Sequence, residues 1–544
     1  MFLEVVNFTL LKYITESFTF FVVLIVFLSG LLTERFQIDN KFTNYIENSY
    51  DKFSRYIYGF FSTKEILIKL EKREFDKIID IREKSLKQTK LTKDLEKWSS
   101  GKMIFDNQIR NIQIRLKGVF SDHWADSEQW SFKVKIKNDE KPFKGLYRFA
   151  LQPPKTTSYM YEWLFMKALE KENLFSLGVN FIDLKINDNH LGVYTLIGQL
   201  SDELIEKNKR KISPIIGFDS ELWIKEQMAS SQIYKKGVIK RENGTEDTYY
   251  RVKINPIQFS EANTESNSIK LKKAINLLES FRQGTIKTSE AFDTAQLAKI
   301  MSLRALLGSY QFDWLDTKFY YNSDKNLLEP ISKEIHVDLE HNYKVHYPTW
   351  WIDSYINRPD YEKNKDFFVD DLYKDKEFYE IYLKELNKFS KNKYFENLIK
   401  ENEKEFKKNL NILKRNYPTK GIFSNEHIEI TRLRIQNYLN PIQNLNVYFQ
   451  NFNDGVLKLN ISNIQRLPIK IIGIKLDDNS IIKINSNFIL DGRKPFLPSK
   501  IKNLEINCNF KSSCKKSRIQ NQKLIFKIMG QDKEKLASIS PYYR

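Results

Sequence analysis

The chain has 544 residues, a length that predicts roughly three to four domains with ample core. Its hydrophobic content of 41% and aromatic content of 14% exclude a disordered chain. The formal net charge is +19, but the Lys residues are interleaved with Asp and Glu, and no long basic arm occurs. This arrangement argues against a nucleic-acid partner.

The first predicted element is an uncharged stretch near the N-terminus, "SFTFFVVLIVFLSGLLT", from Ser17 to Thr33. As a helix it would span roughly 25 Å, the short limit for a bilayer crossing. No small-residue cleavage pattern follows it, which favours a retained anchor over a cleaved signal peptide. Apolar residues cover every face, so a core helix is the least favoured alternative. We expect a single-pass membrane anchor over residues 1–35, with its orientation left open.

Residues 36–104 are predicted to form a helical stem between the membrane and the body of the protein. Ser62-x-x-Glu65 reads as a capping box, and the apolar residues after it keep roughly helical spacing.

Between residues 105 and 200 the spacing of the apolar residues changes from that of a helix to that of strands. The stretches "NQIRNIQIRLKG", "WSFKVKIK" and "GLYRFALQ" alternate polar and apolar residues and predict strands, "SYMYEWLFMKALEKENL" predicts a helix, and "VNFIDLKINDNHLGVYTLI" predicts a strand pair.

Residues 201–439 are predicted to be more helical, with a hairpin near the middle that carries acidic residues at both ends. Asp313 and Asp316 precede the hairpin, and Asp338 and Glu340 follow it. Because antiparallel strands return to the same end, these carboxylates can meet in space. They could then hold Mg²⁺ or handle a proton. The alternative is that they are solvated hairpin ends.

Residues 440–544 are predicted to form a β-sandwich of about a hundred residues, because short strands alternate with Asn, Asp and Gly turns. Cys508 and Cys514, the two cysteines of the chain, lie in "INCNFKSSCKK" within this region. Two readings stay open: a disulfide-closed loop, which implies an oxidising compartment, or two free thiols.

The residues resemble the CotH kinase family of atypical kinases, over about residues 105–440. Matching stretches are "IRLKG", "WSFKVKIK", "RFALQPP", "YEWLF", "LGVYTL" and the hairpin "KFYYNSDKNLLEPI". The resemblance implies an α+β fold with a two-lobed, protein-kinase-like core. Its N-lobe would cover residues 105–200 and its helical C-lobe residues 201–439. The membrane helix and the β-sandwich would flank this core.

The resemblance also implies roles for the acidic residues around the hairpin. Asp338 matches the family's metal-binding Asp. The carboxylate that acts like a catalytic-loop base is Asp313 in one register, with Lys318 where the family has Asn, or Asp316 in a second register. Charged Lys cannot coordinate Mg²⁺, whereas Asp can, so Asp316 is the more compatible metal ligand.

In the nucleotide lobe, the resemblance implies that Lys133 or Lys135 contacts the phosphates of ATP, with Glu162 as its ion partner. The alternative is that both are solvated edge-strand lysines. The chain departs from the family at Gln129 and at residues 197–199.

Two functional hypotheses follow. The first is a membrane-anchored CotH-like kinase that uses ATP and Mg²⁺ to phosphorylate a Ser or Thr hydroxyl of a protein substrate. The second is a catalytically inactive, kinase-like scaffold that binds a cell-envelope protein, which the departures favour. We expect the chain at the cell membrane with its soluble part outside the cytoplasm, a location that would favour the scaffold because ATP is scarce there.

Overall fold

The computed structural model describes residues 63–137, 139–235, 248–258, 265–309, 313–337, 367–418, 420–484, 488–493, 497–508, 514 and 516–541. The predicted membrane anchor, the first part of the predicted stem and Asp338 lie outside these residues. Among the described helices, none is long and apolar enough to cross a membrane.

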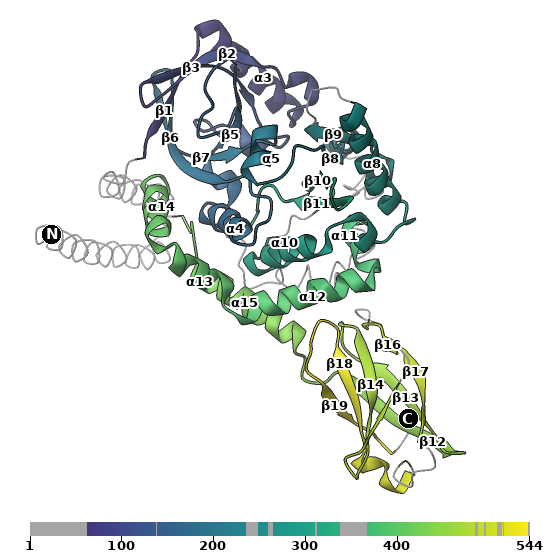
Figure 1. The fold of residues 1–544 in the computed structure, drawn as a ribbon. Helices are drawn as coiled ribbons and strands as arrows, with labels where there is room; N and C mark the ends of the chain where they lie inside the picture. The colour runs from purple at the N-terminus through teal and green to yellow at the C-terminus, as the bar shows by residue number, and fades with distance from the viewer. Residues whose placement is uncertain are drawn as a thin grey trace, which may run out of the picture.

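The N-terminal part of the described chain is a closed β-barrel in the strand order β1-β2-β3-β4-β5-β7-β6 (Figure 1). Parallel pairing of β1 with β6 closes the barrel, and its other pairs are antiparallel. The strands are β1 (Glu65–Lys69), β2 (Ser99–Phe105), β3 (Gln108–Leu116), β4 (Phe132–Ile136), β5 (Arg148–Gln152), β6 (Val179–Ile186) and β7 (Asn189–Gly198).

The prediction of a two-lobed kinase-like core with a separate helical stem is therefore wrong. Seven strands close on themselves where five were expected, and two of the seven come from the predicted stem. The reason is that apolar residues four apart share a face in a strand as well as in a helix. Ile66 and Ile68 are buried in β1, whereas Glu65 and Lys69 are exposed. The helical pattern holds only for α3 (Lys72–Gln88), which follows β1.

Helices pack on one side of the barrel around a second sheet, in the order β11-β10-β8-β9. The helix α10 (Thr294–Leu307) is capped at its N-terminus by Asp293, whose side chain accepts the Gln296 N–H, and at its C-terminus by Gly308, which has a φ of 70°. It is buried and packs against α4, α12 and α15. Figure 1 shows α12 and α15 alongside it.

The elements of this region are α4 (Met160–Lys171), α5 (Asp202–Lys207), β8 (Ile215–Phe218), α6 (Glu221–Lys235), α7 (Thr248–Arg251), β9 (Ile254–Gln258), α8 (Glu265–Arg282), α9 (Thr288–Ala291), α10 (Thr294–Leu307), β10 (Lys318–Asn322), β11 (Leu327–Ile331), α11 (Phe367–Lys374), α12 (Lys376–Lys391), α13 (Tyr394–Glu401), α14 (Glu403–Asn416) and α15 (Asn425–Leu439).

The C-terminal part contains two antiparallel sheets, and Figure 1 shows it beyond α15, at the far end of the molecule from the barrel. One sheet has the order β12-β13-β17, and the other has the order β15-β14-β18-β19, with β16 paired to β14. Their bounds are β12 (Leu445–Asn453), β13 (Val456–Asn463), β14 (Ile469–Lys475), β15 (Ile481–Lys483), β16 (Ile489–Leu490), β17 (Ile501–Asn507), β18 (Lys523–Ile528) and β19 (Lys535–Ser538).

Of the two alternatives left open for the cysteines, the structure has the disulfide. Cys508 and Cys514 are bonded, their Cα atoms lie 6.6 Å apart, and both side chains are buried. The bond closes a short loop directly after β17.

Candidate functional site

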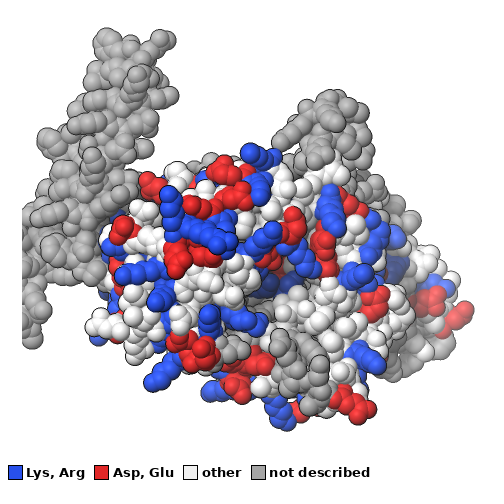
Figure 2. Space-filling view, turned by 90° about the horizontal axis from the view of Figure 1, so that it is seen from above, with Lys and Arg blue, Asp and Glu red and all other residues white. Residues whose placement is uncertain are grey.

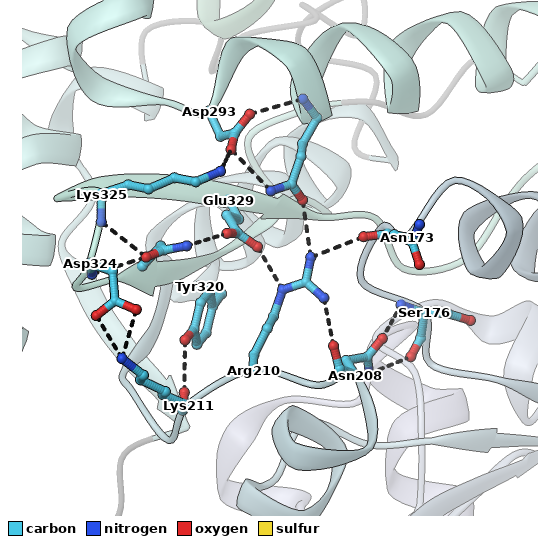
Figure 3. A network of polar contacts seen from close by, with 12 residues as sticks. Asn173, Ser176, Asn208, Arg210, Lys211, Asp293, Tyr320, Asp324, Lys325 and Glu329 are labelled. Atoms are coloured by element: carbon cyan, nitrogen blue, oxygen red, sulfur yellow. Dashed lines mark hydrogen bonds and ion pairs between the residues drawn. The ribbon is translucent and has the colours of Figure 1, made fainter.

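The hairpin of β10 and β11 is held by a network of polar contacts centred on Arg210, which we call the Arg210 network (Figure 3). Arg210 Nε donates to Glu329 Oε2 at 2.6 Å, and Asn322 Nδ2 donates to Glu329 Oε1 at 2.6 Å. Lys325 Nζ lies 2.7 Å from Asp293 Oδ2, at the start of α10. These contacts tie the hairpin to α10 and to the segment after α5, and so fix where its open end lies.

At that open end the two acidic residues predicted from the sequence lie together. Asp313 Oδ1 accepts the backbone N–H groups of Leu315 and Asp316, both at 2.9 Å. Burial first, and the nearby Asp316 carboxylate second, raise the pKa of Asp313 to about 7, against the opposing effects of its two backbone hydrogen bonds and of Lys318. Asp313 can therefore take up and release a proton near neutral pH.

Lys318 is buried at the first position of β10, beside these carboxylates. Its Nζ donates to the Leu315 carbonyl at 2.5 Å. A Cβ on Gly217 would lie 2.5 Å from Lys318 Cδ, so the lysine stem uses space that only glycine leaves free. Burial lowers the pKa of Lys318 to about 7, and Lys333 contributes to the shift.

The segment after β11 brings Lys333 and Glu334 to the same place. Lys117, which follows β3, forms an ion pair with Glu334, and its Nζ also donates to Gln152 Oε1 at 2.5 Å. Burial opposes ionisation of Glu334, but the neighbouring cations, Lys117 first among them, outweigh it and lower its pKa to about 2. This ion pair joins the barrel to the segment after the hairpin.

Lys133 faces the same cluster from β4, where its register partners are Arg115 and Ala150. Burial lowers its pKa to about 7, Arg115, Lys333 and Lys117 add to the shift, and Glu96 opposes it. Burial also lowers the pKa of Lys333, against the opposing effects of Asp316 and Glu334. Within the described residues, neither amine has a hydrogen bond or an ion pair. We call Asp313, Asp316, Lys318, Lys333 and Lys133 the base cluster.

Glu162 has a different position from the one its predicted role requires. It lies fully buried in the first turn of α4, and its Oε2 accepts the Ile335 N–H at 2.7 Å. Burial raises its pKa well above the usual value, and no ion pair in the described part of the chain joins it to Lys133 or Lys135. Glu162 therefore holds the backbone after Lys333 and Glu334 in place.

Of the other predicted residues, Lys135 is half-buried on the same face of β4 as Lys133, and Asp338 lies just beyond the last described residue of this segment. Sequence reasoning missed Lys117, Lys333, Glu334 and Arg304. For Arg304 a signal existed, because it is a charged residue within the apolar stretch "MSLRALL". It is buried, and its guanidinium donates to Ser332 Oγ and Ser309 Oγ at 2.6 and 3.0 Å.

The cluster offers two carboxylates to a metal ion, and no larger group of metal-ligating side chains occurs among the described residues. Mg²⁺ is commonly bound through one or two carboxylates, with substrate phosphates and waters as its remaining ligands. Asp313 and Asp316 therefore fit Mg²⁺ when a phosphate-bearing substrate completes the coordination.

The molecular surface contrasts with this concentration of amines. Figure 2 shows Lys and Arg interspersed with Asp and Glu over the described residues of one face. Mixed surface charge of this kind keeps a chain soluble without selecting one class of polyanion.

No protein-family model matches the sequence, and no curated protein matches it either. The resemblance to CotH kinases therefore stays a prediction, and the chemistry of the base cluster supports a function by itself.

Proposed function

We propose that this chain binds ATP with Mg²⁺ at the base cluster and transfers the γ-phosphoryl group to a Ser or Thr hydroxyl of a protein. Lys133 and Lys333 support this proposal most strongly, because they are half-buried amines whose pKa is lowered by burial and which have no hydrogen bond or ion pair in the described chain. An amine whose pKa is lowered by burial costs stability when it is charged. An anion such as a triphosphate would offset that cost when it binds.

The carboxylates supply the second half of the site. Phosphoryl transfer needs cations on the phosphates, a metal ligand and a group that orients the attacking hydroxyl. In the proposed reaction the hydroxyl oxygen attacks the γ-phosphorus, and the bond to the oxygen bridging the β- and γ-phosphorus atoms breaks. ADP leaves with the electron pair, and the hydroxyl proton passes to a carboxylate. The pKa of Asp313, raised to about 7, suits it to accept that proton.

When bound, Mg²⁺ would neutralise charge on the transferred group, with Asp316 as the better-suited ligand. Asp316 donates its backbone N–H to Asp313 Oδ1, which holds the Asp313 carboxylate against the backbone at Asp316. Lys133 and Lys333 would hold the phosphates from the barrel side and from the segment after β11.

The test is a calorimetric titration of the full chain with ATP and Mg²⁺, followed by incubation with γ-labelled ATP and candidate acceptor proteins. We expect Asp316→Asn to abolish transfer, whereas Asp324→Asn, at the turn of the same hairpin, leaves it intact. An unlabelled acceptor pool together with undetectable ATP binding would overturn the proposal.

Lys318 favours a second candidate, a non-catalytic binding protein for phosphorylated ligands. Its ammonium group already lies beside Asp313 and Asp316, where it competes electrostatically with a metal ion. In this alternative, ATP binding would be unchanged by EDTA and no phosphoryl transfer would follow.

A further inference from the structure

Arg304 connects the two chain segments that lie on either side of the hairpin. It lies in the last turn of α10, and its Nη2 donates to Ser309 Oγ at 3.0 Å. Its Nη1 donates to Ser332 Oγ at 2.6 Å and to the Glu334 carbonyl at 3.2 Å. Ser309 comes before the hairpin, whereas Ser332 and Glu334 come after it and flank Lys333. One guanidinium therefore joins the chain before the hairpin to the segment that carries an amine of the base cluster.

The segment after β11 is also held from α4 and from the end of α10. Glu162 accepts the Ile335 N–H at 2.7 Å, and Ser158 Oγ accepts the Val337 N–H at 2.9 Å. Val337 forms a β-bridge with Ser309 as well. The residues before and after the lysine of this segment are thus fixed to two helices, and the guanidinium supplies the contacts at the beginning of the segment.

Arg304 is a buried cation without a carboxylate partner. It is only 2% exposed, and within the described residues it has no ion pair and its Nε has no hydrogen bond. Burial lowers its pKa to about 10, against the opposing effects of Asp316, Glu162 and Asp313, so it stays charged at neutral pH. An apolar residue at this place in "MSLRALL" would avoid the cost of burying a charge. Stability alone therefore does not account for an arginine here.

We propose that Arg304 is a positioning residue, which fixes where Lys333 lies relative to the two carboxylates of the base cluster. The inference rests on the proposed function, because it concerns the phosphates that the amine holds and the hydroxyl that a carboxylate deprotonates. Misplacing such groups by about 1 Å can cost roughly 100-fold in rate. A planar guanidinium suits this role, because its two terminal nitrogens reach acceptors on both segments at once, whereas a lysine has a single nitrogen.

The first test compares Arg304→Lys with Arg110→Lys in the full chain. Arg110, in β3, is a matched control: it is 7% exposed, has no ion pair in the described chain and donates to the Lys141 carbonyl and to Gln108 Oε1. The two guanidiniums also lie at similar distances from a phenylalanine ring centroid, 5.5 and 5.9 Å. We expect Arg304→Lys to lower kcat for phosphoryl transfer by roughly 100-fold, and Arg110→Lys to change it by less than about threefold. Equal losses in the two variants would overturn the inference.

A double variant separates positioning from a general loss of stability. Ser332→Ala removes one acceptor of the guanidinium, so it should lower kcat by roughly tenfold. If Arg304 acts through Ser332, then Arg304→Lys combined with Ser332→Ala should have nearly the same kcat as Arg304→Lys alone. Losses that simply multiply would contradict a role exerted through this contact.

Hydrogen exchange tests the same claim without nucleotide. We expect the amides of Ile335 and Val337 to exchange about tenfold or more faster in Arg304→Lys than in the parent, and at the parent rate in Arg110→Lys. If the parent transfers no phosphoryl group but this local acceleration occurs, the proposed function fails and the role of Arg304 in holding the segment stands. Parental exchange rates in Arg304→Lys would overturn the inference, whether or not the chain is a kinase.

Discussion

The Arg210 network and the base cluster adjoin the turn and the open end of the same hairpin, yet their charged groups are paired in one and unpaired in the other. In the network each charged group has a partner within hydrogen-bond distance, as Arg210 has Glu329 and Lys325 has Asp293 (Figure 3). In the base cluster Lys133 and Lys333 are half-buried and have no hydrogen bond or ion pair in the described chain. Paired charges hold a fold together, whereas unpaired ones cost stability unless a ligand compensates them.

The largest expected effect comes from breaking a buried ion pair of the Arg210 network. Glu329→Ala should lower the free energy of unfolding by about 3–5 kcal/mol, because it leaves the Arg210 guanidinium buried and uncompensated. The side chains of Glu329 and Arg210 are only 4% and 12% exposed. Chemical denaturation measures the change.

The matched control is Asp324→Ala, which removes an ion pair to Lys211 whose side chains are 64% and 74% exposed. It should cost no more than about 1 kcal/mol. Equal losses in the two variants would show that the Arg210 network does not anchor the hairpin.

The next largest effect is expected in the C-terminal sheets, which lie far from the base cluster. Reducing the Cys508–Cys514 disulfide should destabilise the C-terminal sheets by about 2 kcal/mol, because the reduced loop regains conformational freedom in the unfolded chain. Ligand affinity at the base cluster should not change. Denaturation and titration with and without reductant measure both quantities, and a coupled loss of affinity would link two regions that we treat as independent.

A smaller effect concerns the unpaired lysines of the base cluster and is measured as the pH dependence of stability. In the folded chain the pKa of Lys133 is lowered to about 7, so the unfolded chain binds more protons between pH 7 and about 10.5. Stability is therefore lost as the pH falls through this window, and the loss is complete below pH 7. Lys133→Met should be more stable than the parent at pH 6 by on the order of 1–2 kcal/mol, and the gain should vanish near pH 10. A gain that is the same at both pH values would mean that the amine is not desolvated.

The sequence predicted individual strands well, but it did not predict that the N-terminal strands close into a barrel. Alternation identified β3 and β4, and the hairpin register that brings Lys318 opposite Ile331 follows from strand geometry. The barrel was missed because nothing in "EILIK" specifies its parallel pairing with β6, which depends on contacts more than a hundred residues away. The partners of Lys117 and Glu162 were missed for the same reason, since Glu334 and Ile335 reach them only through the tertiary fold.

Lys333→Met tests most directly the claim that the unpaired amines form a ligand site. The measurement is the melting temperature of parent and variant, each with and without saturating ATP and Mg²⁺, beside Lys135→Met as a control on β4. We predict that the variant without ligand melts at or slightly above the temperature of the parent, because a desolvated charge has been removed. We also predict that the ligand-induced increase in melting temperature is lost in this variant and kept in the control. A variant that melts several degrees lower without ligand, while still being stabilised by ATP as the parent is, would contradict the claim.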